Sequence, residues 1–174
     1  MATLNLNKKL FLVILVSFFL FSCIDDKEKN CTYMNLRPYI ILRGFQPTDA
    51  EVKKAYLLVY SKNDFKNKID SINSIRIISD YKKRDDISSP NVHIYFDDLE
   101  SKKTNLDTEH NYILVTDNKT KYMISGYTFK QVSRKMLFKI KKYCLVDSMK
   151  VSNIKIEVDG ATLWFSKNLG VPLK

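Results

Sequence analysis

Few side chains of this sequence are placed for catalysis. His93 and His110 are its only histidines, and neither has a second histidine or a cysteine at the short spacing of zinc sites. Ser125 precedes Gly126, but the Gly-x-Ser-x-Gly pattern of a nucleophile elbow is absent. Cys144 beside a histidine would make a nucleophile, although a core or disulfide cysteine is the more common use. The sequence therefore predicts no catalytic residue and no metal site.

The acidic residues and glycines lead to the same expectation. Adjacent carboxylates occur at Asp85-Asp86 and Asp97-Asp98. Neighbours on a strand point apart, whereas glycosidases need two carboxylates that face each other across a sugar. Asp97, Asp98 and Glu100 lack the twelve-residue pattern of a calcium loop. The four glycines are too scattered for a phosphate-binding loop. We therefore expect no cofactor.

The first 22 residues have the three parts of a secretory signal. Lys8 and Lys9 supply its positive charge. The apolar run from Leu10 to Phe21 is shorter than the roughly 20 residues that a membrane-spanning helix needs. The small residue Ser22 ends the segment. We therefore expect residues 1–22 to be removed as a signal peptide.

The end of this segment resembles the lipobox of bacterial lipoproteins. Leu20, Ser22 and Cys23 match its aliphatic residue, its small residue and its acylated cysteine. The resemblance implies that Cys23 carries palmitate-type acyl chains and anchors the protein in the cell envelope, in the outer membrane. Residues 23–33 are expected to form a flexible tether, because they are polar without periodicity. Its acidic residues also resemble the export signal of surface lipoproteins in the Bacteroidetes, so a periplasmic and a cell-surface position both stay open.

Cys31 and Cys144 form the remaining pair of cysteines. An even pair in a chain bound for an oxidising compartment predicts a structural disulfide. It would join the start of the domain to its late part. The alternative is a reduced, buried Cys144 and a free Cys31, because sequence separation does not give the Cα distance that a bridge requires.

The chain is strongly basic. Its 29 lysines and arginines outnumber its 19 acidic residues, for a formal charge of +10, and without residues 1–22 the charge is +8. Such a surface attracts anionic lipid headgroups, acidic glycans or an acidic protein. Nucleic acid is not an expected partner, because the chain carries a secretory signal and few of its cations are arginine, the usual phosphate ligand. An ordinary lysine-rich surface is the alternative.

After residue 34 the sequence shows the two-residue hydrophobic period of β-strands. Pro38 places the first strand at a sheet edge or at its own start. Ala55–Tyr60 is apolar on both faces, which predicts a strand covered on both sides. Residues 130–146 fit a strand or a helix, and the strand is favoured. The strands are expected at 36–43, 55–60, 74–80, 92–97, 112–116 and 122–129, with 65–72 as a loop or edge element and 98–111 as a long loop.

The last two strands are predicted as a hairpin. Asp159-Gly160 is a residue pair that type I′ turns favour, and the alternating segments 154–158 and 161–165 flank it. This register places Lys155 opposite Trp164 on the face away from the core. Short strands without a confident long helix predict an all-β fold. We expect an antiparallel β-sandwich of about seven or eight strands, formed by residues 34–174 as a single domain.

Parts of the domain also resemble small lipoproteins of the Bacteroidetes. The likeness lies in residues 40–45, 56–65 and 122–126 and in the strand, cysteine and hairpin of the ending. It implies a transthyretin-like or immunoglobulin-like sandwich and implies no activity.

Two features predict binding. Trp164 with Lys155 offers an aromatic contact for a protein or glycan partner, unless another strand or residues 66–74 cover it. The basic residues Arg134, Lys135, Lys139 and Lys141 would line a strand and contact anionic headgroups, or else are ordinary surface charge.

These observations predict a lipid-anchored, non-enzymatic protein that binds a protein or glycan partner in the cell envelope. A periplasmic immunity protein or enzyme inhibitor is the alternative, because a basic surface can mask an acidic enzyme. A hydrolase with an unrecognised site is a lower alternative.

The lipid anchor is directly testable. We expect mass spectrometry of the protein from its native membrane to find acyl chains on Cys23, and the Cys23→Ser variant to lose both this mass and its membrane association. An unmodified Cys23 in the wild-type protein would disprove the anchor.

Overall fold

The computed structural model describes residues 31–45, 51–62, 64–73, 75–79, 91–102, 104–117, 119–136 and 139–173. The predicted signal peptide, Cys23 and residues 23–30 of the tether lie outside these residues. The chain divides into two units. The larger unit consists of Cys31–Val132 and Cys144–Lys174, and the described part of the other is residues 133–136 and 139–143.

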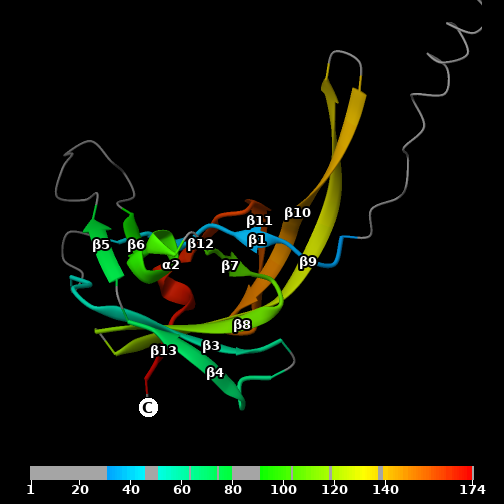
Figure 1. Ribbon diagram of the computed structural model, residues 1–174. Coiled ribbons are helices and arrows are strands. Elements are labelled where there is room, and N and C mark those ends of the chain that lie inside the picture. The colour runs from blue at the N-terminus through cyan, green and yellow to red at the C-terminus, as the bar shows by residue number, and fades with distance from the viewer. Residues whose placement is uncertain are drawn as a thin grey trace, which may run out of the picture. The chain divides into compact units, whose positions relative to one another are not determined.

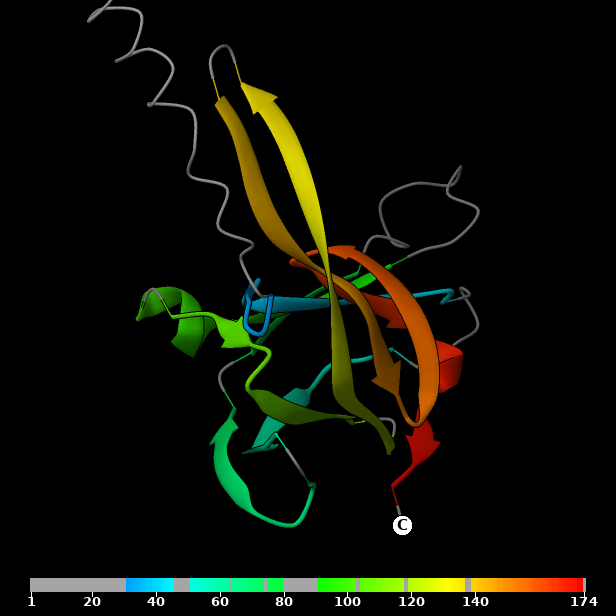
Figure 2. The same ribbon diagram turned by 90° about the vertical axis from the view of Figure 1, so that its right-hand side faces the viewer.

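A seven-stranded sheet contains most of the strands (Figure 1). Its strands lie in the order β11-β10-β9-β8-β3-β4, and β13 also pairs with β9. Figure 2 shows β9, β10 and β11 side by side. The bounds are β3 (Ala55–Ser61), β4 (Lys68–Ile72), β8 (His110–Thr116), β9 (Thr120–Met136), β10 (Lys139–Val151), β11 (Ile154–Gly160) and β13 (Val171–Pro172).

A four-stranded sheet has the order β12-β2-β6-β5. Its strands are β2 (Tyr39–Arg43), β5 (Ile75–Ser79), β6 (Val92–Phe96) and β12 (Leu163–Ser166). The strands β12 and β2 are parallel, and the other pairs are antiparallel. A third, two-stranded sheet joins β1 (Asn35–Leu36) to β7 (Leu106–Asp107). The remaining elements are the one-turn helix α2 (Asp97–Ser101) and the 3₁₀ helix η2 (Lys167–Leu169).

One apolar core joins the two larger sheets. Alternate residues of β2 and β6, such as Leu42 and Ile94, are fully buried, and so are Leu57 and Leu114 in the seven-stranded sheet. The rings of Tyr122 and Phe165 meet across the core, with centroids 5.3 Å apart. Tyr122 donates a hydrogen bond to the carbonyl oxygen of Lys167, and burial raises the pKa of its hydroxyl to about 12. The predicted all-β, sandwich-like fold is therefore confirmed.

Most predicted strands are present, with shifted ends. The strand interpretation of residues 130–146 is confirmed, because β9 runs to Met136 and β10 begins at Lys139. Pro38 was expected to place its strand at a sheet edge or to mark the start of the strand, and the second of these is correct. Strand β2 begins at the next residue and lies between β12 and β6, so it is not an edge strand. The segment 65–72 contains an edge strand, β4.

Two other expectations are wrong. The strand at Ala55–Tyr60 is not covered on both faces, since Tyr56 is 36% exposed while Ala55, Leu57 and Val59 are buried. Residues 98–111 are not one long loop, because they contain most of α2 and all of β7. Buried Leu106 and Thr108 anchor this segment to the domain.

The predicted closing hairpin is also wrong. β11 pairs with β10 and β12 pairs with β2, so the two strands belong to different sheets. The tight turn lies instead at Ser152-Asn153, whose φ values of 48° and 72° are both positive, as a type I′ turn requires. Consequently Lys155 pairs with Lys150, and Trp164 pairs with Ile41.

Gly160 still uses its conformational freedom, but inside β11. Its φ is +103°, and it pairs with Val146 beside a register shift between Val146 and Ser148. A residue with positive φ is typical of such a β-bulge. The Asp-Gly pair therefore bends the end of a strand where a hairpin turn was expected.

The predicted disulfide is confirmed. Cys31 and Cys144 are bonded, with their Cα atoms 5.5 Å apart and a sequence separation of 113. The bridge ties the first described residue of the chain to β10. In the chain-entropy model, closing so long a loop destabilises the unfolded state by about 4 to 5 kcal/mol.

We therefore expect the double variant Cys31→Ser/Cys144→Ser to unfold at lower urea concentration, with a free energy of unfolding about 4 to 5 kcal/mol below that of the oxidised protein. It should keep its far-ultraviolet circular dichroism spectrum, because neither cysteine belongs to the apolar core. The wild type under reducing conditions is the matched control, and its free energy of unfolding should equal that of the double variant. A difference below about 1 kcal/mol would contradict the loop-closure account.

Candidate binding face

The outer face of the four-stranded sheet carries an unusual set of side chains. Successive side chains of a strand point to opposite faces. Because Ile40 and Leu42 enter the core, Tyr39 and Arg43 of β2 must point outward. The same alternation turns His93 and Tyr95 of β6, Arg76 of β5 and Trp164 of β12 outward. We call these six residues the aromatic face.

Strand register brings the rings of the aromatic face together. Tyr39 pairs with Tyr95, and their ring centroids are 5.3 Å apart. His93 stacks nearly parallel to Tyr95, at 6.3 Å between centroids and an interplanar angle of 14°. The Tyr39 hydroxyl lies 3.5 Å from Thr162 Oγ1. The three rings therefore form a continuous, half-buried cluster across two neighbouring strands.

Two arginines cover rings of this face. The guanidinium carbon of Arg43 lies 3.9 Å from the centroid of Trp164, and that of Arg76 lies 4.8 Å from the centroid of Tyr95. A cation above an aromatic ring is attracted to its electron-rich face. Arg76 also forms an ion pair with Asp97, with 3.3 Å between Nε and Oδ1. Both arginines are exposed at the surface of the sheet.

Tryptophan, tyrosine and arginine are the residue types that dominate the energy of protein interfaces. From general strand spacing, this sheet face measures about 14 Å by about 15 Å. That is smaller than a standard interface of about 800 Å² per partner, so it would form the centre of a contact and not the whole. The face can bind and orient a partner, and its chemistry suits an acidic one.

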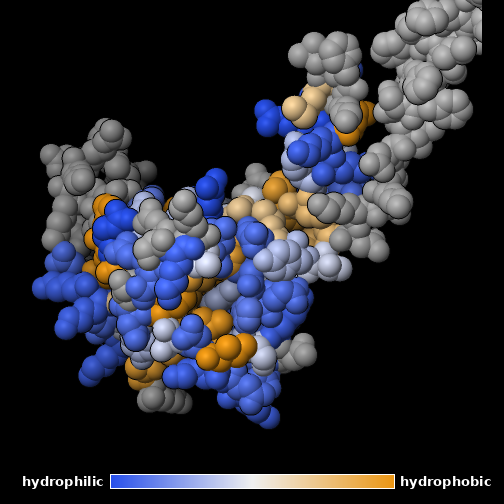
Figure 3. All heavy atoms as spheres, viewed as in Figure 1, coloured by the Kyte–Doolittle hydropathy of each residue, from blue (hydrophilic) through white to orange (hydrophobic). Residues whose placement is uncertain are grey.

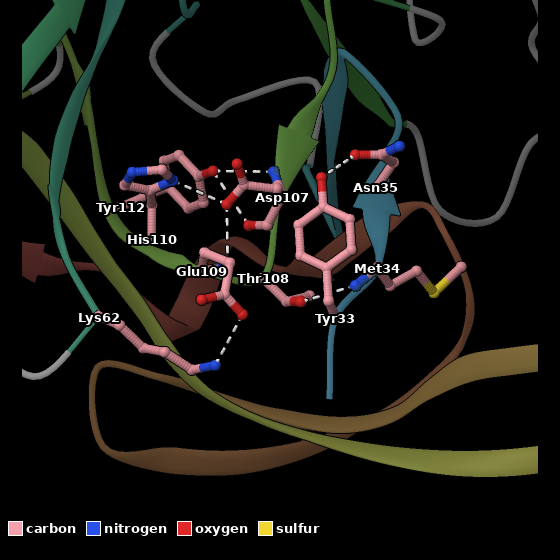
Figure 4. A network of polar contacts seen from close by, with 9 residues as sticks. All are labelled: Tyr33, Met34, Asn35, Lys62, Asp107, Thr108, Glu109, His110 and Tyr112. Carbon is pink, nitrogen blue, oxygen red and sulfur yellow. Dashed lines mark hydrogen bonds and ion pairs between the residues drawn. The ribbon is translucent and has the colours of Figure 1, made fainter. Parts of the chain in front are cut away.

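A second polar cluster lies near β1 and β7 (Figure 4). The Tyr112 hydroxyl accepts a hydrogen bond from the Asp107 amide at 2.9 Å and donates one to the Asp107 carbonyl at 3.0 Å. Asp107 Oδ1 lies 2.7 Å from His110 Nδ1 and accepts from the Glu109 amide at 2.9 Å. All of these contacts lie within residues 107–112, so the cluster stabilises the local fold and is not a candidate site.

The same cluster links separate strands. Thr108 Oγ1 accepts from the Met34 amide at 2.9 Å, next to β1, and Glu109 pairs with Lys62, next to β3, at 3.0 Å. Tyr33 donates to the side chain of Asn35. Burial raises the pKa of Tyr112 and also that of Tyr127 well above the ordinary tyrosine value. Both hydroxyls are therefore neutral at physiological pH, and that of Tyr112 donates to Asp107.

No group of three or more His, Cys, Asp or Glu side chains within the described residues could hold a metal ion. Among these residues, no helix is both long and apolar enough to cross a bilayer.

The structure separates the binding residues that the sequence predicts. Trp164 belongs to the aromatic face, whereas Lys155 is exposed on β11 in the other sheet. Arg134 and Lys135 are exposed at the end of β9, and Lys141 is exposed in β10 with its Nζ 5.3 Å from the Tyr143 ring centroid. Lys139 lies in β10, and its side chain is outside the described residues. The roles of these residues in binding, and of Cys23 in lipidation, stay predictions.

Sequence reasoning missed the other five members of the aromatic face. Alternation in β2 and β6 already places Tyr39, Arg43, His93 and Tyr95 opposite the core residues. The missing information was that β12, β2, β6 and β5 are neighbours, which a single sequence does not give. No protein-family model, no curated protein and no solved structure matches this chain.

Two tyrosines near the polar cluster give a stability prediction. The Tyr127 hydroxyl is buried and lacks a hydrogen-bond partner among the described residues, whereas the Tyr112 hydroxyl has two bonds to Asp107. A buried polar group without a partner destabilises a fold. We expect Tyr127→Phe to raise the free energy of unfolding by about 1 kcal/mol and Tyr112→Phe to lower it by about as much.

Urea unfolding followed by circular dichroism measures both changes, and the paired variants serve as each other's control because each removes one oxygen. A loss of stability in Tyr127→Phe would show that its hydroxyl is bonded in solution.

Proposed function

We propose that this protein is anchored in the bacterial cell envelope through acylated Cys23 and binds a protein partner, without transforming it, through the aromatic face. The observation that supports this function most is the pair of arginines stacked on Trp164 and Tyr95 at the surface of one sheet. Residue types and geometry both resemble the centre of a protein interface.

The arginines favour a protein over a glycan. Sugar rings bind by stacking on open aromatic faces, and in this structure Arg43 and Arg76 already cover one face each of Trp164 and Tyr95. A guanidinium held on a ring presents its N–H groups sideways, where it can form two parallel hydrogen bonds to a carboxylate. The partner we expect therefore combines aspartate or glutamate side chains with apolar contacts.

The charge of the chain supports the same partner. The formal charge of +8 that the chain carries without residues 1–22 raises the rate at which an acidic protein encounters this surface. Electrostatics of this kind act mainly on association and orientation, and the rings supply the apolar contact area. Binding should therefore weaken with increasing salt without being abolished.

An immunity protein or enzyme inhibitor is the second candidate, and the basic, arginine-bearing face favours it. Such a protein blocks an acidic enzyme by covering its active site. It is distinguished by a stoichiometric complex in which the activity of the bound enzyme is lost.

The test begins with the unlipidated chain from residue 24 crosslinked to envelope proteins of the source cells. The captured protein is then purified, and its affinity for the wild-type and variant chains is measured by isothermal titration calorimetry, which does not depend on Trp164, the only tryptophan. We expect Arg43→Glu and Trp164→Ala each to weaken binding at least about 30-fold, as interface hot spots do.

Lys53→Glu and Tyr56→Ala are the matched controls, because both side chains are exposed and neither belongs to the aromatic face or to its sheet. They should change the affinity less than about twofold. Equal losses in the controls would disprove this face as the site. If no protein is captured and oligosaccharides, neutral or acidic, bind saturably at Trp164, the partner is a glycan and the proposed protein partner is wrong.

A further inference from the structure

The end of the β9–β10 pair exposes apolar side chains to solvent. We call residues 133–136 and 139–143 the hairpin tip; they form the described part of the smaller unit. Met136 is 54% exposed and Ile140 is 68% exposed, and none of the core residues belongs to the tip. The tip therefore presents apolar surface that the fold itself does not use.

Cations surround these apolar residues. Arg134, Lys135 and Lys141 are exposed beside Met136 and Ile140. Figure 3 shows hydrophilic and hydrophobic side chains next to one another at the end of β9 and β10. From residue 118 to residue 146 the sequence contains no aspartate or glutamate. At the base of the strands, by contrast, Lys130 pairs with Asp147 at 3.7 Å.

The exposed apolar residues and the cations of the hairpin tip together favour one kind of binding partner, a membrane surface. Exposed apolar side chains ringed by lysine and arginine are typical of elements that lie in the interface of a membrane, where the apolar groups leave water and the cations meet anionic headgroups. An acidic protein would pair with the cations, but its binding would not require exposed apolar side chains at the end of the strand pair. We propose that the hairpin tip docks on a bilayer that contains anionic phospholipids.

Chain connectivity allows the tip to dock on the same membrane as the lipid anchor. Only this part of the argument rests on the proposed function, because it assumes an acylated Cys23. Seven residues separate Cys23 from Cys31, so the eight Cα–Cα steps between them reach at most about 29 Å. Cys31 is bonded to Cys144, which directly follows Tyr143 of the tip. The disulfide therefore holds the base of the tip, at Tyr143, within about one tether length of the anchored residue. Anchor and tip would contact the same membrane and fix the orientation of the domain on it.

The test uses the chain from residue 24, which lacks the signal and the acylated cysteine but keeps the whole apolar core. Vesicles of phosphatidylcholine, alone or with 25% phosphatidylglycerol, are sedimented with the protein at low and high salt. We expect binding to the anionic vesicles only, with a loss at high salt. Each lysine or arginine near such a surface strengthens binding about fivefold, so Arg134→Gln/Lys135→Gln/Lys141→Gln should weaken it about 100-fold.

Lys53→Gln/Lys54→Gln/Lys68→Gln removes the same charge from exposed positions outside the tip and is the matched control. It should bind nearly as well as the wild type, and Met136→Ser/Ile140→Ser should bind at least about tenfold more weakly. Equal losses in both charge variants would overturn the proposal, because net charge alone would explain them. Retention on heparin through the tip without vesicle binding would also overturn it. The aromatic face is unchanged in all these variants, so its assay stays independent.

Discussion

Burial of apolar side chains between the seven-stranded and four-stranded sheets constrains the rest of this structure. Ile40, Leu42 and Ile94 are fully buried, and each fixes the register of its strand. A slip by one residue would exchange the two faces of the strand and place arginine in the core. The outward position of Arg43 and Tyr95 is therefore enforced by the packing of their neighbours. The aromatic face and the core are two consequences of one register.

The sequence contained much of the secondary structure and little of the topology. Period-two alternation in 92–96 predicts β6 and the three buried residues Val92, Ile94 and Phe96 correctly, because alternation is a local property. The cysteine pair could be predicted from compartment and number. The pairing of β12 with β2 could not be predicted from the sequence, because it joins segments from the two ends of the domain. The aromatic face depends on that pairing, and only Trp164 of its six members was singled out.

The closing segment shows how tertiary packing overrides turn chemistry. Asp159-Gly160 has the stronger local preference for a tight turn, yet the turn forms at Ser152-Asn153. A hairpin at Asp159-Gly160 would have paired Ile154 with Phe165. The structure instead buries Leu163 and Phe165 almost completely against β2 and leaves Ile154 53% exposed. Burial of two large apolar side chains stabilises by several kcal/mol, more than a turn preference contributes.

The parallel pairing of β2 with β12 also determines when the fold can form. Tyr39 and Thr162, which meet beside this pairing, are 123 residues apart in sequence. Long-range contacts form late, because the entropy of closing the intervening chain must be overcome first. During synthesis the edge of β2 that pairs with β12 stays unpaired until nearly the whole chain has left the ribosome. For a chain exported as we propose, this delay keeps the precursor unfolded and able to thread through a narrow translocation channel.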